Sequence, residues 1–484
     1  MTYGPRIAMH IFLGRCMHGR LRVGMTSSWY DKQWWNRSSC VTDQRSITMA
    51  LSVSRRRFLG TSAGSAVALA SGPLLAQADA LPSQKVTVGI MGLNRGMQVA
   101  AALEKQPGVV IKYVCDVDSK RADEAKAKLE RSGQQRPQAI TDFRRILDDK
   151  EVDALFCEAP NHWHGPATIL ACDAGKHTYV EKPCSHNPWE GEQMIAAARK
   201  HQRAVQMGVQ RRSTPGVMEA VTKLHAGIIG NVYCARSWYN NNRSSLGIGK
   251  QTNPPATLDY DLWQGPAPRT PYLDNRIHYN WHWFWHWGNG ELGNNGVHSL
   301  DLCRWGLNVE FPTVVVSSGG RYSFRDDQQT PDTHVANFEF PGGKQITWQG
   351  LSCNKHPDST GYVSFYGDKG ALSLGQFGDY KIYNADDKLI EERPDDAGGR
   401  NPWLAVDTFH TAHFIAAIRS GDHFGLSAQI EKGHRSTLLC HLGNTAYRTQ
   451  RTLKCNPENG HIQGDAEAMS FWQREYEPGW KPIV

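Results

Sequence analysis

The sequence contains little of several features that would mark a specialised class of protein. Its eleven cysteines are scattered and never form a C-x-x-C pair, which argues against a zinc ribbon or a disulfide framework and favours core cysteines. It also contains no apolar run of about 20 residues, the length that a membrane-spanning helix needs. A chain of 484 residues with 40% hydrophobic and 21% charged residues instead fits a folded globular protein of two or three domains.

The excess positive charge of the chain is confined to its first 80 residues. The formal net charge is +7, but residues 1–80 hold ten Lys and Arg against three acids, which leaves 44 residues of each sign in 81–484. A neutral body offers no broad electrostatic attraction to nucleic acid or anionic lipid. We therefore expect neither a nucleic-acid partner nor an integral membrane protein.

The N-terminal region reads as an export signal. Residues 54–60, S-R-R-R-F-L-G, form a twin-arginine pattern, and a weakly apolar stretch and the A-x-A site at 78–80 follow it. We predict a twin-arginine signal peptide over residues 49–80 and a periplasmic mature protein. Residues 1–48 show no helical or strand period, and we interpret them as a non-native extension.

The next segment has the order of a dinucleotide fold. A buried strand is expected over 85–91, a glycine-containing turn over 92–96, a helix over 97–105, and a second strand over 109–115 that ends at Asp116. Asp116 would accept hydrogen bonds from the adenosine ribose hydroxyls and repel a 2′-phosphate. We predict NAD as the cofactor, although Lys120 and Arg121 leave NADP open.

The turn itself departs from G-x-G-x-x-G at one position. Gly92 allows the tight turn, Gly96 allows the helix to pack on the strand, and Asn94 replaces the middle glycine. Asparagine tolerates a left-handed backbone better than most residues, so the turn can survive. We expect Gly92, Asn94, Arg95 and Gly96 to bind the cofactor.

The strand–helix alternation then repeats to residue 208. Helices are expected over 118–131, 166–174 and 189–201, and strands over 152–157, 177–180 and 204–208, with a loop at 158–164. This order predicts an N-terminal Rossmann domain, 81–208, with a doubly wound parallel sheet. Ligands lie beyond the carboxyl ends of such strands. We therefore add to the cofactor site the residues Pro160, Asn161, His164, Glu181 and Lys182.

After residue 208 the pattern changes to short, closely spaced strands. They are expected over 232–239, 313–318, 333–340, 344–351, 361–367 and 371–383, with turns at 341–343 and 367–370. Helices over 404–419 and 427–448 would cover one face. We predict an α+β domain over 209–484, built on a mostly antiparallel open sheet that can also serve as an oligomer surface.

These segments together resemble the Gfo/Idh/MocA oxidoreductases. The matching motifs are G-I-M-G-L-N-R-G (89–96), C-D-V-D (115–118), A-P-N-H-W-H (159–164), E-K-P (181–183) and G-V-H-S-L-D-L (296–302). The resemblance implies that Lys182 reaches nicotinamide and substrate, that His298 acts as acid or base, and that the protein forms a homodimer or homotetramer. Many members carry an aspartate where this chain has Asn294, which puts the usual relay in doubt. Asp301 would either orient His298 or close the end of its helix.

An aromatic stretch over 276–287 points to sugar binding. Trp and Tyr alternate there with His, Arg and Asn, the mixture that stacks on sugar faces and binds hydroxyls. If the stretch is extended, its four tryptophans point one way and His282 and His286 the other. His278, His282 and His286 could also suggest a metal site, but the segment lacks acidic partners, and we predict no metal. Gln210 to Arg212 either line the cleft or form a solvated turn. The expected substrate-binding residues are Arg211, Arg276, His278, Trp281, His282, His286, Asn294 and His298.

These features lead to one main hypothesis and two alternatives. The main one is a periplasmic NAD-dependent oxidoreductase that acts on a secondary hydroxyl of a sugar or glycoside. Because free NAD is scarce outside the cytoplasm, we expect a tightly held cofactor, loaded before export, and redox-neutral turnover or electron transfer to a second substrate or carrier. The first alternative is an NAD-dependent glycoside hydrolase with Tyr239, His282 or His286 as a second base. The second is a non-catalytic sugar-binding protein.

Overall fold

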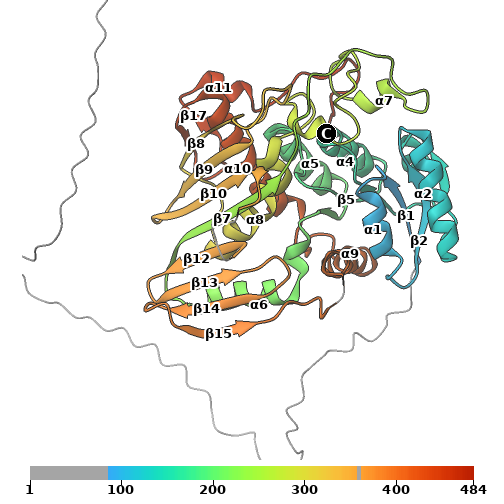
Figure 1. Cartoon of the computed structure of the whole chain (residues 1–484). Coiled ribbons are helices and arrows are strands. Elements are labelled where there is room, and N and C mark those ends of the chain that lie inside the picture. The colour runs from blue at the N-terminus through green and yellow to red at the C-terminus, as the bar shows by residue number, and fades with distance from the viewer. Residues whose placement is uncertain (1–84, 357–360, 400) are drawn as a thin grey trace, which may run out of the picture. The chain divides into compact units, whose positions relative to one another are not determined.

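The computed structural model describes residues 85–356, 361–399 and 401–484 (Figure 1). The predicted extension and signal peptide, residues 1–80, lie outside the described residues. The described part contains two sheets with helices packed around them.

The first sheet confirms the predicted doubly wound parallel architecture. Its six strands are all parallel, in the order β3-β2-β1-β4-β5-β6. This order brings the carboxyl ends of β1 and β4 side by side, at the point where the direction of winding reverses. The strands are β1 (Val86–Met91), β2 (Val109–Cys115), β3 (Gln138–Ile140), β4 (Ala154–Cys157), β5 (His177–Val180) and β6 (Val205–Met207).

Five helices connect these strands: α1 (Gly96–Leu103), α2 (Ser119–Ser132), α3 (Arg144–Asp148), α4 (Asn161–Asp173) and α5 (Pro188–Lys200). One of them corrects the sequence prediction. We expected a loop up to residue 164 and a helix from Pro166, but α4 begins at Asn161 and contains Pro166 in its interior. Trp163, in its first turn, is 2% exposed and packs edge-on against Phe143. Burial of this turn therefore outweighs the usual preference of proline for a helix start.

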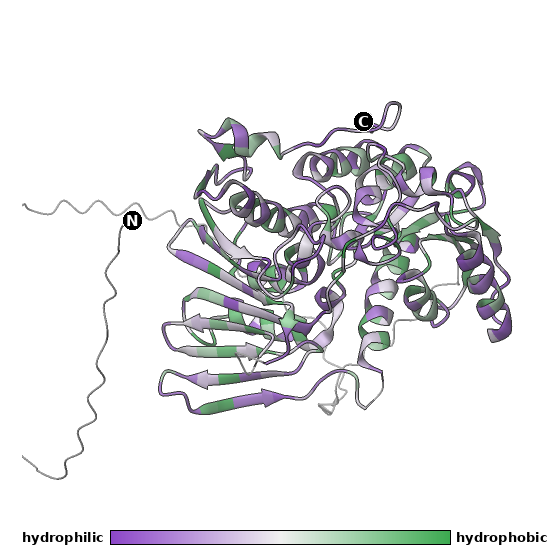
Figure 2. Ribbon diagram, turned by 45° about the horizontal axis from the view of Figure 1, so that its top comes forward, coloured by the Kyte–Doolittle hydropathy of each residue, from purple (hydrophilic) through white to green (hydrophobic). Residues whose placement is uncertain are grey.

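The second sheet is mostly antiparallel, as predicted. Its order is β15-β14-β13-β12-β7-β10-β9-β8-β16-β17, with β11 paired to β7, and only β7 and β10 run parallel. The strands are β7 (Val232–Asn242), β8 (Val314–Gly320), β9 (Thr333–Phe340), β10 (Lys344–Leu351), β11 (Cys353–Asn354), β12 (Val363–Gly367), β13 (Gly370–Leu374), β14 (Tyr380–Asn384), β15 (Leu389–Arg393), β16 (Leu453–Cys455) and β17 (Ile462–Gln463). Apolar and polar residues alternate along these strands (Figure 2).

The single strand expected over 371–383 is in fact two strands. β13 ends at Leu374 and β14 begins at Tyr380, and the two pair antiparallel. Gly378, with φ of +96°, lies in the connecting turn, a backbone conformation that side chains other than glycine rarely adopt. The turn reverses the chain, so the pattern that we interpreted as one long strand belongs to a hairpin.

The helices of the second half pack in two different places. They are α6 (Pro215–His225), α7 (Tyr260–Gln264), α8 (Val297–Leu307), α9 (Pro402–Ser420), α10 (Ile430–Thr449) and α11 (Ala466–Ser470). α6, α8 and α10 contact the large sheet, as predicted for α10, whereas α9 packs mainly against α1 and the 3-10 helix Gln210–Ser213. α9 lies beside α1, where Phe414 packs edge-on against Phe156 of the first sheet (Figure 1).

The described cysteines are free, and seven of the nine are buried, which confirms that most are core residues. Among the helices that the structure describes, none has the length and apolar character to cross a membrane.

Candidate functional site

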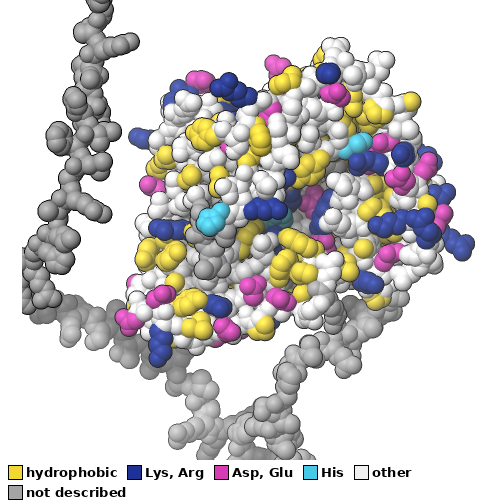
Figure 3. Space-filling view, viewed as in Figure 1, with side chains coloured by type: hydrophobic (Ala, Val, Ile, Leu, Met, Phe, Trp, Pro, Cys, Tyr) yellow, Lys and Arg dark blue, Asp and Glu magenta, His cyan; other side chains and the backbone are white. Residues whose placement is uncertain are grey.

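A cavity opens beyond the carboxyl ends of the parallel strands. The first sheet contributes residues after β1, β2, β4 and β5, and the second half contributes α7, the aromatic stretch and the turn before α8. The space-filling view in Figure 3 shows a hollow in the surface, with charged and histidine side chains visible inside it. Of the residues predicted to bind the cofactor, all but Gly96 line the cavity: Gly92, Asn94, Arg95, Asp116, Pro160, Asn161, His164, Glu181 and Lys182.

The turn after β1 has the geometry that a nucleotide cradle requires. Gly92 has φ of +89°, and a Cβ there would lie 2.6 Å from the carbonyl carbon of Glu158. A Cβ on Gly96 would lie 2.8 Å from Ile90, so Gly96 allows α1 to pack on β1. Asp116 accepts hydrogen bonds from the backbone N–H groups of Leu93 and Asp118, both at 3.0 Å, and so holds the turn against the end of β2. These features fit NAD binding.

The side chain of Arg95 links the start of α1 to the E-K-P segment and to α9. It donates to Glu181 at 3.0 Å and forms a two-pronged ion pair with Asp407 of α9. Burial would raise the pKa of Glu181, but the charges of Arg95 and Lys182 bring it below its ordinary value. Arg95 therefore fixes the orientation of Glu181 in the E-K-P segment.

Glu158 is the buried acid that the sequence prediction missed. It follows β4, is 7% exposed, and neither carboxyl oxygen has a hydrogen-bond partner among the described residues. Burial, with the charge of Glu181 acting in the same direction, raises its pKa well above the ordinary value. Its place directly after a parallel strand was a usable signal, because such positions face the ligand.

Lys182 is held by the residue that replaces the family aspartate. Its Nζ donates to the backbone carbonyl of Asn294 at 2.8 Å and to the side-chain Oδ1 at 3.1 Å. Asn294 lies in a single π-helical turn, Leu292–Gly296, immediately before α8, and such turns are frequent at functional sites. Burial lowers the pKa of Lys182, and the nearby charge of Glu181 opposes that shift. The amide of Asn294 is uncharged, so it adds no negative charge to those that oppose the shift.

His298 lies one position into α8 and does not itself line the cavity. Its buried Nδ1 has no hydrogen-bond partner in the described part of the chain. Burial lowers its pKa well below the ordinary value, and the charges of Arg211 and Lys182 lower it further. The imidazole is therefore neutral and retains a free ring nitrogen at neutral pH.

Asp301 takes neither of the roles that we considered for it. Its carboxylate accepts two hydrogen bonds from Nε of Arg212, at 2.8 and 2.9 Å, and a third from Ser436 of α10. Gln210 to Arg212 are buried in a short 3-10 helix, Gln210–Ser213, so the solvated-turn interpretation is wrong. Arg211, also predicted as a substrate residue, is stacked over Tyr362 and donates to Gln376 outside the cavity lining.

The aromatic stretch is folded rather than extended. Asn280–Trp283 form a 3-10 helix, so the alternating arrangement that we considered does not occur. His278, Trp281 and His282 line the cavity together with Asn294, whereas Arg276 and His286 do not. His282 stacks on Trp281 with ring centroids 3.6 Å apart.

The three histidines of this stretch have separate partners. His278 contacts Asp118 at 3.1 Å, His282 bonds to the carbonyl of Tyr279, and His286 to that of Pro268. Within the described ranges, no group of three or more His, Cys, Asp or Glu is arranged to hold a metal ion.

Residues 245–287, here called the roof, contribute six residues to the lining of the cavity: Leu262, Trp263, His278, Tyr279, Trp281 and His282. An apolar cluster within the roof, which includes Leu258, Trp263 and Trp287, also packs against Val117 after β2. Backbone hydrogen bonds of 2.9 Å join Ser119 to Thr257 and Asp259 to Val117. A second attachment lies at α4, where the carbonyl of Trp263 bonds to the side chains of His162 and Trp163, at 2.8 and 3.1 Å.

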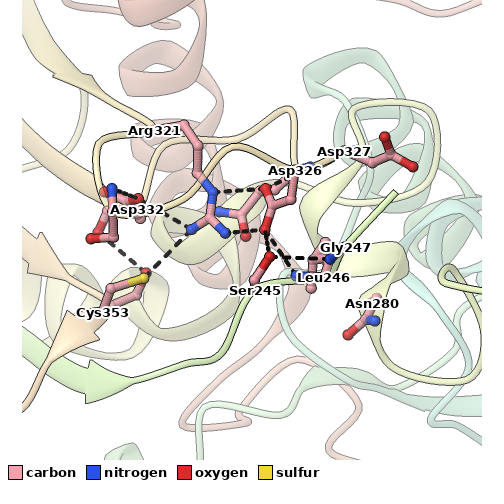
Figure 4. Close-up of polar contacts among 12 residues, drawn as sticks. Ser245, Leu246, Gly247, Asn280, Arg321, Asp326, Asp327, Asp332 and Cys353 are labelled. Carbon is pink, nitrogen blue, oxygen red and sulfur yellow. Dashed lines mark hydrogen bonds and ion pairs between the residues drawn. The ribbon is translucent and has the colours of Figure 1, made fainter. Parts of the chain in front are cut away.

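The roof is also anchored to the large-sheet half of the molecule. Asp326 accepts hydrogen bonds from Ser245 Oγ and the backbone N–H of Leu246, both at 2.8 Å, and pairs with Arg321 (Figure 4). Burial would raise the pKa of Asp326, but the hydrogen bonds from Arg321 and Leu246 lower it to about 2. The carboxylate is therefore charged and holds the start of the roof in place.

Comparisons with known proteins agree with this architecture. The family model "Oxidoreductase family, NAD-binding Rossmann fold" matches residues 86–209, and "Oxidoreductase family, C-terminal alpha/beta domain" matches residues 238–481. The uncharacterized oxidoreductase YrbE of Bacillus subtilis is 30% identical over 197 residues, 40% of this chain and 52% of that protein. The levoglucosan dehydrogenase of Pseudarthrobacter phenanthrenivorans is 26% identical over 176 residues, 36% of this chain and 38% of that protein.

These matches span about half or less of the relatives' own length. Among solved structures, the aldose-aldose oxidoreductase of Caulobacter crescentus, complexed with glycerol, has the same fold. Its TM-score is 0.57 at 19% identity, over 77% of this chain and 100% of that one. With both family models matched in order along the two sheets, the chain belongs to the Gfo/Idh/MocA oxidoreductase family.

Proposed function

We propose that this protein is a periplasmic oxidoreductase that interconverts a secondary hydroxyl and a carbonyl of a sugar with a tightly held NAD. The observation that carries the proposal is the contact between Lys182 Nζ and Asn294 inside the cavity beyond the parallel strands. It presents an amine with a lowered pKa beside the nucleotide cradle. The names of the sugar-oxidising relatives support the substrate class.

The chemistry needs a group that takes the hydroxyl proton. NAD, when bound, accepts the hydride from the carbon. Lys182 accepts the proton at Nζ, because burial favours its neutral form, and Asn294 holds it through two oxygens. His298 stays a candidate for the second proton carrier, but its pKa is lowered well below the ordinary value by burial, so its imidazole is a weak base.

The roof supports the tight hold on the cofactor. It lines part of the cavity and is attached at the end of β2, at α4 and at Asp326, so this side of the cavity is formed by chain that is fixed at three places. A protein exported in folded form would keep a nucleotide enclosed in this way. Each turnover would then have to return the hydride to a second sugar or a carrier.

The hydrolase alternative receives less support. Tyr239, one of its candidate bases, has a pKa raised to about 12 by burial and by the charge of Glu291, and its hydroxyl is bonded to Arg243 and Asn241. His286 lies outside the cavity. The remaining candidate, His282, has its pKa lowered to about 3 by burial, which makes it a weak base.

The test is to produce the full chain in a bacterium with twin-arginine export and purify the periplasmic product. Released nucleotide is identified by mass spectrometry, and sugars are then added while the absorbance of reduced nicotinamide is followed. We expect near-stoichiometric NAD(H), reduction by at least one sugar, and its loss in Lys182→Met. A protein without nucleotide and without affinity for NAD would contradict the proposal. Glycoside cleavage without net reduction would favour the hydrolase, and sugar binding without turnover the binding protein.

A further inference from the structure

An ion pair between Arg243 and Glu291 connects two segments that line the cavity, the roof and the turn before α8. Arg243 directly follows β7, and its Nε donates to the Glu291 carboxylate at 2.7 Å, with a second bond from Nη2 at 3.3 Å. The side chain of Glu291 is only 2% exposed and that of Arg243 19%. Neither residue lines the cavity itself, so any effect of the pair on the reaction passes through other residues.

Glu291 holds the turn that presents Asn294 to Lys182. It is the residue immediately before the π-helical turn. Its carboxylate also accepts a hydrogen bond from the side chain of Asn295, the neighbour of Asn294 in that turn. The position of Asn294, and with it both hydrogen bonds from Lys182, therefore depends on the ion pair with Arg243.

Arg243 also fixes a side chain of the roof that lines the cavity. Its Nη1 donates to the hydroxyl of Tyr279 at 3.3 Å, and its guanidinium lies over the ring of Trp283, 4.6 Å from the ring centroid. Tyr279 lines the cavity together with Lys182 and Asn294. One arginine thus holds both the turn beside the amine and an aromatic side chain of the cavity.

Glu291 acts on the amine of Lys182 by its charge as well. Burial lowers the pKa of Lys182, and Glu291 opposes that shift, as Glu181 does more strongly. The other titratable groups that interact with this amine are Arg95, Arg211, Glu158, His164, His282, His298 and Cys440. Among the three acids in this set, Glu291 is the one that does not line the cavity.

We propose that Arg243 and Glu291 are positioning residues for Lys182. The pair holds Asn294 against the amine, and Glu291 supplies from outside the cavity part of the negative charge that Asn294 lacks. Arg243 limits that charge, because an ion pair acts more weakly on a third group than a lone carboxylate does. The inference rests on the proposed role of Lys182 as the base and deepens it, since it names the residues that set when the amine is neutral.

The experiment follows the protonation of Lys182 in the full-length, nucleotide-containing protein. Acetic anhydride reacts with the neutral amine, so the rate of acetylation of Lys182 against pH, read by peptide mass spectrometry, gives the pH at which half of the amine is neutral. The wild type is compared with Glu291→Gln, Arg243→Gln and Arg243→Lys. Glu431→Gln is the matched control, because it removes an ion pair with Arg199 at another place on the surface.

This measurement needs no sugar turnover. A protein that oxidises no sugar would contradict the proposed function, whereas the acetylation profile would still test the role of the pair. Retained nucleotide content shows that each variant is folded.

Glu291→Gln should lower the pH of half-neutralisation of Lys182 by about half a unit or more, because it removes a negative charge and keeps the shape of the side chain. Arg243→Gln should raise it, since the carboxylate then acts without its partner, and Arg243→Lys should restore the wild-type value. Loosening of the turn alone would instead raise it in both glutamine variants, because water would reach the amine.

The decisive result is therefore the direction of the change in Glu291→Gln. An unchanged or raised value in that variant would overturn the proposal, as would a shift of the same size in Glu431→Gln. Where sugar oxidation is measured, the profile of kcat against pH should move in the same direction as the acetylation profile in each variant.

Discussion

Lys182 and Asn294 are joined by a 3.1 Å hydrogen bond between Nζ and the side-chain Oδ1, where many members of the family place a charged aspartate. The amide holds the amine in position but lacks the negative charge with which an aspartate would favour the protonated form. Burial can therefore lower the pKa of Lys182 with only Glu181 and the more weakly acting Glu291 in opposition.

The substitution Asn294→Asp should move the pH dependence of sugar oxidation. A carboxylate at this distance raises the pKa of Lys182 by about one unit or more. Because only the neutral amine accepts a proton, the pH at which the rate reaches half of its maximum should rise by the same amount. The measurement is kcat against pH for the wild type, for this variant, and for Asn459→Asp at an exposed position as control. An unchanged profile would show that Lys182 is not the titrating base.

Gly92→Ala should weaken nucleotide binding because the added Cβ clashes with the backbone, in addition to the strain of its positive φ. A Cβ would lie 2.6 Å from the backbone of Glu158, and we expect the NAD affinity to fall by roughly 10- to 100-fold. Gly133→Ala is the matched control, since its φ is +75° but nothing lies within 4 Å of the added Cβ. That variant should lose only about 1 kcal/mol of stability and keep its affinity. Equal NAD affinities in the two variants would contradict the proposal that the turn at Gly92 binds the nucleotide.

Asp326→Ala should loosen the roof. The Asp326 side chain is fully buried, and its loss leaves Arg321 with only Asp332 as an ionic partner. We expect the free energy of unfolding to fall by about 3–5 kcal/mol and bound nucleotide to leave faster, as measured by dilution into a nucleotide scavenger. Glu130→Ala, which removes an exposed pair with Lys126, should change stability by less than about 1 kcal/mol. An unchanged release rate would show that this anchor does not retain the cofactor.

Glu158→Gln should stabilise the nucleotide-free protein at higher pH only. The pKa of Glu158 is raised in the folded state, so the folded form holds a proton that the unfolded form, with a pKa of about 4.3, has released. Wild-type stability therefore falls as the pH rises from that value towards the folded pKa, by about 1.4 kcal/mol for each step of one in pH.

Urea unfolding of both proteins at pH 5 and pH 8 checks this expectation. The stability difference in favour of Glu158→Gln should be larger at pH 8, and Glu130→Gln at an exposed position should show no such trend. The same difference at both pH values would mean that Glu158 is already ionised in the folded protein.

Local sequence patterns predicted the elements whose character depends on neighbours in the chain. β9 and β10 have the bounds that we expected, because their alternating residues flank the turn at 341–343. β2 and β5 also match, since both are short segments rich in β-branched and aromatic residues, which favour strands. The turn at Gly92 and the E-K-P lysine were found from motif order.

Long-range partners were not predictable in the same way. The apolar face of α9 shows that the helix is buried, but not that Phe414 packs on the first sheet. Arg212 and Asp301 are 89 positions apart, and nothing local marks them as a pair. The sequence did not show which tryptophans of the aromatic stretch pack in the core, and in the structure Trp283 and Trp287 are 2% and 1% exposed in the roof. Their contribution is to packing.

The roof has a kinetic consequence. If the cofactor is held tightly, as proposed, it would exchange only when the attachments of the roof at β2, α4 and Asp326 open. The rate of exchange is then set by the protein and not by nucleotide concentration. Two sugars would have to use the same site in succession, and initial-rate plots would show the parallel lines of a ping-pong reaction.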